Sequence, residues 1–496
     1  MKNRLYSFFA GSLYPFGFAP FDFWPLTLLS LLSLLVLLKD TPLKDSLILG
    51  FLYGIGLWSV GVSWVFVSIY YHGNTTIIVA LLITLLFILF LSLYNLLFTF
   101  MFKKLSLGNN LDILLAFPFS WVLVEFLRSY LFTGFPWMIL GTSISSTRID
   151  GWIAVLGVYG NSYFLLILVS VIFLVCKGIQ VKKSFFYSFL SLIFLLSTCL
   201  ILDEVSWTKL KGKASVTVVQ PNLSIEEKWS LEGLSKTKLL IEETILQAKE
   251  SEIVFFPETA IILDEERNKE WLNKIDQIAY ERKVSLISGI VGINKETKEF
   301  TNRVKGYGLA EGYYDKIHLV PFGEYIPFAK VLGKLLRIFK IYIGETKGGE
   351  SFSSIKVEEV RISPTICYEI AFNNLVRKSA IKGNLLLTIS NDTWFGKSIG
   401  PNQHNEIAQT RAAEHQKTLI RSTNSGISSI IKGDGKIIDK IKRFEDKVIK
   451  HEIDILEGRT PFSIYGNIPI YLILLVSLSV LIILKRTNVL KYQKYF

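Results

Sequence analysis

The chain has 496 residues, enough for two or three domains, and half of its residues are hydrophobic. A mean hydropathy of +0.41 excludes an ordinary soluble protein of this size. The formal charge of +12 does not indicate nucleic-acid binding, because residues 203–465 carry 39 basic and 36 acidic residues, whereas residues 1–202 carry 11 and 6. The basic excess thus lies beside apolar runs, where it sets membrane topology, and we expect no nucleic-acid partner.

Residues 1–202 indicate a membrane domain, because apolar runs of about 17–25 residues are long enough to cross a bilayer. The expected spans are residues 5–20, 23–38, 46–70, 76–101, 111–132, 152–176 and 185–202. The first run is short and contains Pro15 and Gly17, and a basic N-terminus precedes it, as in a signal peptide. No small-residue cleavage site follows, so we expect an uncleaved span and a total of seven.

Charged loops predict the orientation of these spans. Lysines in phase with Lys2 and Arg4 occupy alternate loops: Lys39, Lys44, Lys103, Lys104, Lys177, Lys182 and Lys183. By the positive-inside rule the N-terminus is cytoplasmic, and seven spans deliver residue 203 to the outer, periplasmic side. Residues 466–496 are expected to form a last span, Ile468 to Leu484, and a basic tail that returns the C-terminus to the cytoplasm.

Two charged residues lie inside a predicted span. Glu125 and Arg128 are three residues apart and therefore share one helical face. Charges within a membrane usually face the interior of a bundle, which makes the pair a candidate part of a substrate path. Anchoring of the helix at the outer interface explains the same pair equally well.

The exported domain, residues 206–465, alternates short β-type runs with helical stretches, which predicts an α/β layered fold. The expected strands are Ser215–Gln220, Ile253–Phe256, Ser285–Gly289, Gly306–Ala310, Glu359–Cys367, Leu385–Ser390 and Ile427–Lys432. The expected helices are Ser235–Lys249, Asn268–Arg282 and Gln403–Leu419. About 260 residues are ample for one buried core.

Three residues with the potential for chemistry follow or end β-type segments, where α/β folds place functional groups. Cys367 is the one cysteine away from the apolar membrane runs, Glu258 follows an apolar strand, and Lys316 lies in an aromatic-rich segment. Each has an ordinary alternative: a small buried hydrophobe for the cysteine, a solvated loop acid for the glutamate and a surface lysine. A papain-like Cys–His pair is a further alternative, with His318, His404 and His415 available.

The order Glu258, Lys316, Cys367, with spacings of 58 and 51 residues, resembles the catalytic triad of the nitrilase superfamily. That resemblance implies a general base, an oxyanion-stabilising lysine and a nucleophilic thiol on an α-β-β-α sandwich. Glu324 in PFGEY matches the second glutamate of the superfamily, which helps to hold the lysine.

Longer motifs resemble those of the apolipoprotein N-acyltransferase family. They are FAPFDFWPL at 18–26, GVSWVFVSIY at 61–70, EFLRSYLFTGFPW at 125–137, GVYGNSYF at 157–164, FPETA around Glu258, YDKIHLVPFGEYIP around Lys316, ICYE around Cys367, SNDTWFG at 390–396, SIGPNQH at 398–404 and RSTNSGIS at 421–428. The resemblance implies transfer of an acyl chain from a phospholipid, through a Cys367 thioester, to the α-amino group of a diacylglyceryl-cysteine lipoprotein at the bacterial inner membrane. It also implies that Tyr368 and Glu369 support the active site and that Trp229 helps to bind substrate.

One basic stretch, residues 328–344, lies beside the lysine motif. Lys330, Lys334 and Arg337 follow helical spacing, and apolar residues occupy other faces. We expect this segment to lie in the lipid headgroup layer, with Leu332, Leu335 and Phe339 binding the acyl chain. Packing of those side chains against the domain's own core is the alternative.

Neither a metal nor a dissociable cofactor is expected, because the five histidines form no cluster with ligand spacing. We expect a monomer. Two other functions stay open: a membrane-tethered amidase or hydrolase of the nitrilase type, and a non-catalytic membrane protein that binds lipid or lipoprotein.

Overall fold

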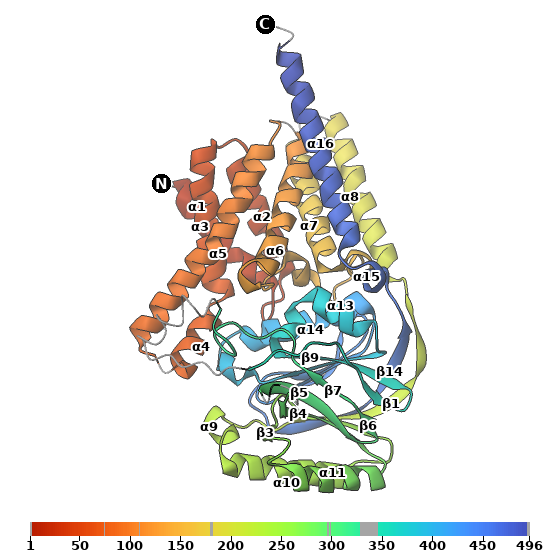
Figure 1. The fold of residues 1–496 in the computed structure, drawn as a ribbon. Helices are drawn as coiled ribbons and strands as arrows, with labels where there is room; N and C mark the ends of the chain where they lie inside the picture. Colours follow the sequence, from red (N-terminus) through yellow and green to blue (C-terminus); the bar gives the residue numbers. More distant parts are fainter. Residues whose placement is uncertain are drawn as a thin grey trace.

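The computed structural model describes residues 2–73, 75–108, 110–178, 182–294, 297, 299–327 and 346–493. A bundle of helices stands on an α/β domain, and the last helix returns from that domain into the bundle (Figure 1). The predicted acyl-chain residues Leu332, Leu335 and Phe339 lie outside the described residues.

Nine helices of the described chain form the bundle. They are α1 (Lys2–Leu13), α2 (Trp24–Lys39), α3 (Leu43–Gly61), α4 (Trp64–His72), α5 (Ile77–Leu105), α6 (Phe117–Tyr130), α7 (Ile153–Gly178), α8 (Lys182–Asp203) and α16 (Ile468–Gln493). Their outward faces are apolar: Ile78 on α5 and Phe194 on α8 are 74% and 67% exposed. Such faces suit contact with hydrocarbon and not with water.

Among the described residues, six helical segments are long and apolar enough to cross a membrane, against eight predicted spans. The predicted spans 5–20 and 23–38 form helices of only 12 and 16 residues, because α1 gives way to a tighter turn that contains Pro15. The predicted span 46–70 is not one helix: the backbone leaves the helical conformation at Val62, and α4 starts anew at Trp64.

Basic residues meet at the end of the bundle that lies away from the α/β domain. Lys103 Nζ donates to the carbonyl oxygens of Leu38 and Lys39 at 3.1 and 3.0 Å. Lys485 Nζ donates to the carbonyl oxygen of Lys104 at 2.5 Å. Both chain termini lie toward this end as well (Figure 1). A lysine ammonium group at this position also interacts favourably with the negative, C-terminal end of a helix dipole.

Two mixed sheets form the centre of the α/β domain. The first has the order β14-β1-β2-β4-β5-β7, with β3 beside β4, and comprises β1 (Thr208–Gln220), β2 (Ile253–Phe255), β3 (Ile261–Asp264), β4 (Ser285–Ile293), β5 (Phe300–Gly308), β7 (Tyr313–Asp315) and β14 (Lys447–Gly458). The second has the order β13-β12-β11-β10-β9-β8-β6 and comprises β6 (Ala310–Glu311), β8 (Ile355–Val357), β9 (Val360–Ile366), β10 (Leu385–Ser390), β11 (Leu419–Thr423), β12 (Ser428–Ile431) and β13 (Ile437–Ile441).

Alternating side chains bury both faces of each sheet. On β2, Ile253 and Phe255 enter the core between the sheets, whereas Val254 packs with α10 (Leu231–Gln247) and α11 (Lys269–Glu281). On β10, Leu385 faces the same central core, whereas Leu386 packs with the helices on the other side. The result is the α-β-β-α order of layers that the sequence predicts.

The helix α14 (Gly400–His415) lies between the second sheet and the bundle (Figure 1). Its Ile407, Ala408 and Ala412 belong to the apolar core that the bundle helices also form. Its polar side chains bond to the bundle: Glu406 Oε2 accepts from the Ala19 N–H at 3.1 Å, and Glu414 Oε1 accepts from the Val158 N–H at 2.8 Å. The α/β domain therefore docks on the bundle largely through this buried helix, with further bonds such as that from Ser68 to the carbonyl oxygen of Trp394.

Candidate active site

The sheets bring three of the predicted residues into one buried cluster. Glu258 follows β2 and Lys316 follows β7, so both come from the first sheet. Lys316 Nζ lies 2.9 Å from Glu324 Oε1 and 3.7 Å from Glu258 Oε1. The lysine is 1% exposed and Glu258 is 6% exposed, so these charges interact with little screening by water.

Both oxygens of the Glu258 carboxylate are held by donors. Asn302 on β5 donates from Nδ2 to Oε1 at 2.6 Å, and the backbone N–H of Asn391, after β10, donates to Oε2 at 2.6 Å. The carboxylate is thus fixed by both sheets at once. An acid held in this way keeps one position for proton transfer.

Cys367 comes from the second sheet, directly after β9. Its φ of +54° lies in the left-handed region, which is disfavoured for a residue with a side chain and recurs at functional sites. Burial, reinforced by the Glu258 charge, raises the pKa of the thiol to about 12, while Lys316 opposes this shift. The resting thiol is therefore protonated near neutral pH, and a nucleophilic role for this sulfur would require a base.

Lys316 remains a cation in this cluster. Burial lowers the pKa of its ammonium group, but Glu324, Cys367 and Glu258 outweigh burial and hold that pKa above its usual value. Glu324 itself is fixed, because its Oε2 accepts from the Val320 N–H at 2.7 Å. A fixed buried cation is suited to stabilise an oxyanion.

Glu369, one of the predicted supporting residues, joins the lysine segment to the cysteine segment. Its Oε1 accepts from the Ile317 N–H at 2.7 Å and the His318 N–H at 3.0 Å, and its Oε2 accepts from the Ile366 N–H at 2.7 Å. Tyr314 donates a further hydrogen bond to Oε1 at 2.8 Å. Burial raises the pKa of Glu369 to about 7, against the opposing effect of these donors. This carboxylate therefore sets the spacing of Lys316 and Cys367.

Tyr368, predicted to support the site, and Trp229, predicted to bind substrate, follow directly on Cys367 and Lys228 in the chain. Tyr368 donates from its hydroxyl to the carbonyl oxygen of Gly134 in the bundle at 3.0 Å. Trp229 is 52% exposed and caps the short helix α9 (Ile225–Lys228). Its predicted contact with substrate stays a prediction.

Lys228 was not predicted from the sequence. It is 3% exposed, and its Nζ donates to the carbonyl oxygen of Glu258 at 2.7 Å. Burial lowers the pKa of this ammonium group to about 8, although Glu258 and Cys367 favour its charged form. No pattern in the sequence marks this lysine, because its partner is a backbone carbonyl 30 residues further along the chain.

The histidines of the papain-like alternative have other partners. His404 Nε2 lies 3.1 Å from the carbonyl oxygen of Cys367, and His415 Nδ1 lies 2.7 Å from Ser463 Oγ. The His318 ring packs on Phe372 with 3.9 Å between the ring centroids. These contacts favour Glu258 over a histidine as the partner of the thiol.

Glu125 and Arg128 both face the interior of the bundle, where they are 3% and 4% exposed. Glu125 Oε1 accepts from the Leu140 N–H at 2.8 Å, and Arg128 Nη1 donates to the carbonyl oxygen of Phe135 at 2.7 Å and that of Trp137 at 2.5 Å. The pair therefore fixes the segment 135–140. The burial agrees with charges that face the interior of a bundle, and both predicted roles of the pair stay predictions.

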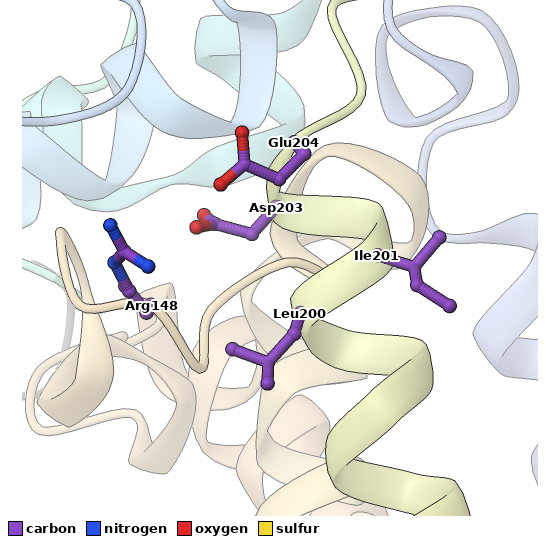
Figure 2. Close-up of a pocket in the computed structure, with 5 residues that line it drawn as sticks. All are labelled: Arg148, Leu200, Ile201, Asp203 and Glu204. Atoms are coloured by element: carbon purple, nitrogen blue, oxygen red, sulfur yellow. The ribbon is translucent and has the colours of Figure 1, made fainter.

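An open pocket of about 400 Å³ lies at the end of α8, apart from the cluster. Arg148, Leu200, Ile201, Asp203 and Glu204 line it. Figure 2 shows the Arg148 guanidinium directed toward the carboxylates of Asp203 and Glu204 across the opening. The pocket contains none of the predicted catalytic side chains.

Comparisons with known proteins agree with both halves of the chain. Residues 10–172 match the family described as "Apolipoprotein N-acyltransferase N-terminal domain", and residues 215–459 match "Carbon-nitrogen hydrolase". The fold and the site therefore define a membrane enzyme built on a carbon–nitrogen hydrolase domain.

Relatives that align with nearly the whole chain show to which family within this class the chain belongs. Proteins named "Apolipoprotein N-acyltransferase" from Haemophilus influenzae and Pasteurella multocida are 32% and 30% identical to this chain, each over 98% of this chain and 96% of its own length. One from Wigglesworthia glossinidia brevipalpis is 34% identical over 93% of this chain and 94% of its own. The chain belongs to the apolipoprotein N-acyltransferase family and is an acyltransferase.

Proposed function

We propose that this acyltransferase takes an acyl chain from a phospholipid and gives it to the α-amino group of a diacylglyceryl-cysteine at the N-terminus of a bacterial lipoprotein. Glu258 takes the thiol proton while the Cys367 sulfur attacks the ester carbonyl carbon. A C–S bond forms, and Lys316 with a backbone N–H stabilises the oxyanion. The ester C–O bond then breaks, and the proton passes from Glu258 to the departing oxygen of the lysophospholipid.

The second half of the reaction runs through the same atoms. The neutral amine of the acceptor attacks the thioester carbonyl carbon, so that a C–N bond forms and the C–S bond breaks. Glu258 receives a proton from the amine and returns it to the Cys367 thiolate. The products are an amide on the lipoprotein and the free thiol.

The observation that carries this proposal is the buried cluster itself. Lys316 Nζ lies 2.9 Å from Glu324 and 3.7 Å from Glu258, and Cys367 follows a strand of the facing sheet with its backbone at φ +54°. A base, a cation and a thiol are what acyl transfer through a thioester requires. The thiol pKa of about 12 supports the need for Glu258 as the base.

Substrate contacts are proposed from the sequence alone. Trp229 and the segment that contains Leu332, Leu335 and Phe339 would receive the lipid. Replacing those three apolar residues with serine should impair lipid turnover more than it lowers the yield of folded protein. Equal losses of both would contradict this role.

The orientation in the membrane is also part of the proposal. The lysines at the end of the bundle away from the α/β domain support a cytoplasmic location for that end and for both termini. The α/β domain would then face the periplasm of the inner membrane. A fluorescent reporter that folds only in the cytoplasm should be active when fused to the C-terminus and inactive when inserted after residue 295.

The decisive experiment is intact-mass analysis of the purified protein after incubation with phospholipid in the absence of an acceptor. We expect the mass of one acyl chain on Cys367, labile to neutral hydroxylamine. A diacylglyceryl-cysteine peptide added next should discharge the adduct to an amide. Discharge to a free fatty acid instead would favour a hydrolase, and a folded protein without an adduct would favour a binding protein.

A further inference from the structure

His404, which takes no part in the proposed reaction, contacts the backbone carbonyl oxygen of Cys367. A left-handed backbone at a residue with a side chain costs about 1–3 kcal/mol and persists only when neighbouring groups enforce it. His404 on α14 supplies one such group, because its Nε2 lies 3.1 Å from the carbonyl oxygen of Cys367. His404 is 1% exposed, so this contact is closed to water.

The neighbours of the ring determine its proton positions. A carbonyl oxygen only accepts, so Nε2 must carry a proton. Nδ1 faces a donor, Arg421 Nη2, at 3.0 Å and an acceptor, Asp392 Oδ1, at 3.1 Å, and the same Arg421 Nη2 donates to Asp392 Oδ2 at 2.7 Å. Burial and the Arg421 charge lower the pKa of His404, which agrees with a neutral ring. In the neutral ring the single proton is on Nε2 and is directed at Cys367, and Nδ1 accepts from Arg421 and does not donate to Asp392.

The hydrogen bond to the Cys367 carbonyl oxygen fixes the orientation of the whole peptide group between Cys367 and Tyr368. In a trans peptide the C=O and the next N–H are coplanar and point in opposite directions. A hydrogen bond from His404 to the Cys367 oxygen therefore orients the N–H of Tyr368 toward the opposite edge of that peptide. A backbone N–H beside the thiol is the kind of donor that an oxyanion requires.

Gln403, the residue before His404 on α14, bonds to the bundle. Gln403 Oε1 accepts from Trp137 Nε1 at 2.7 Å, and Gln403 Nε2 donates to the carbonyl oxygen of Gly61, the last residue of α3, at 3.2 Å. The Trp137 ring packs beside the His404 ring, with 5.7 Å between centroids. Trp137 belongs to the segment that Arg128 holds. The His404 ring is thus positioned from two sides, by Asp392 and Arg421 of the α/β domain and by Trp137 of the membrane half.

We infer that His404 is a positioning residue, through which the membrane half of the chain holds the Cys367–Tyr368 peptide in the orientation that acylation requires. The inference rests on the proposed function, in which Cys367 forms the thioester. It accounts for the position of α14, which contacts both the bundle and the carbonyl oxygen of Cys367.

The test compares His404→Leu with His404→Gln in single-turnover acylation by phosphatidylethanolamine in mixed micelles, followed by intact mass. The leucine variant should acylate about 100-fold more slowly, with the lipid concentration at half-maximal rate unchanged, because only the transition state loses its donor. Glutamine retains an N–H donor and should recover about tenfold of this loss. The control is His415→Leu, which removes a buried histidine near the other end of α14, bonded to Ser463. It should lower the melting temperature but leave the acylation rate within about threefold.

Each outcome decides a different point. Wild-type acylation rates in His404→Leu, or equal losses in both leucine variants without rescue by glutamine, would overturn the inference. An unmodified Cys367 in the wild-type protein would overturn the proposed function and the inference with it. Should His404→Leu fail to fold, Trp137→Phe tests the same path, because it removes the bond to Gln403 and keeps the aromatic packing. It should slow acylation about threefold to tenfold, and an unchanged rate would overturn the inference.

Discussion

The thiol of Cys367 offers a test in which two neutralising substitutions act in opposite directions. The negative charge of Glu258 raises the pKa of the thiol, and the positive charge of Lys316 lowers it. We therefore predict that Glu258→Gln lowers the thiol pKa and that Lys316→Met raises it. The glutamine variant should react faster with a small alkylating agent although it no longer transfers acyl chains.

The size of the effect follows from the closeness of the charges. Glu258 and Lys316 lie 3.7 Å apart and are both buried, so each interacts with a thiolate in the same low-dielectric region. A unit charge about 6–8 Å from the thiolate, at an effective dielectric constant of about 20, contributes about 2–3 kcal/mol, or about 1.5–2 pH units. Residual screening reduces this to an expected shift of about 1–2 units for each substitution.

The assay is the rate of alkylation of Cys367 by iodoacetamide between about pH 7 and 11, read by mass. Cys176→Ser and Cys199→Ala form the common background, so that one thiol remains. Near pH 8 the glutamine variant should react about 10- to 100-fold faster than the parent. A matched control is Glu265→Gln, which removes a carboxylate paired with Arg303 in the same domain and should leave the profile unchanged. A higher thiol pKa in Glu258→Gln, or shifts of the same sign in both variants, would refute the electrostatic account.

Three further substitutions test the supports of the site. Glu369→Ala strips three backbone N–H groups of their acceptor and should cost about 3–6 kcal/mol, seen as a lower melting temperature and lost acylation; a wild-type melting temperature would contradict this. Lys228→Met removes the bond to the Glu258 carbonyl and should slow single-turnover acylation about 10- to 100-fold in folded protein, whereas an unchanged rate would assign the lysine to stability alone. Tyr368→Phe loses the hydrogen bond to Gly134 and should cost about 0.5–1.5 kcal/mol of stability, visible as a small fall in melting temperature that Tyr368→Ala should exceed.

The strands β9 and β10 could be predicted because they are short, apolar and central, whereas the edge strand β7, which precedes Lys316, was not predicted. Leu385–Ser390 forms β10 as expected, and the run that ends at Cys367 forms β9. The edge strand β14 was missed, since alternate positions on it are charged and exposed, as in a solvated loop. The predicted helix 403–419 ends early, because Gln416 adopts a left-handed conformation and Leu419 begins β11.

The candidate reactive residues were easier to propose from the sequence than the residues that hold them. Glu258, Lys316 and Cys367 belong to motifs whose residue types suggest a reaction. The bonds that Asn302 on β5 and Lys228 on α9 make to Glu258 depend on which elements meet in space. No local pattern encodes such meetings, and one of the two partners is a backbone carbonyl that any residue would present.

The burial of α14 on all sides has a consequence for how the enzyme can be divided. Cuts after Asp203 and before Ile468 would release what looks in sequence like a soluble catalytic fragment. They would also expose Ile407 and Ala408 and leave the carboxylates of Glu406 and Glu414 without the amide groups of the bundle. The helices that cross the bilayer are therefore part of the folding unit of the enzyme, not a replaceable anchor, and grafting the fragment onto a foreign membrane helix would not restore a working thiol.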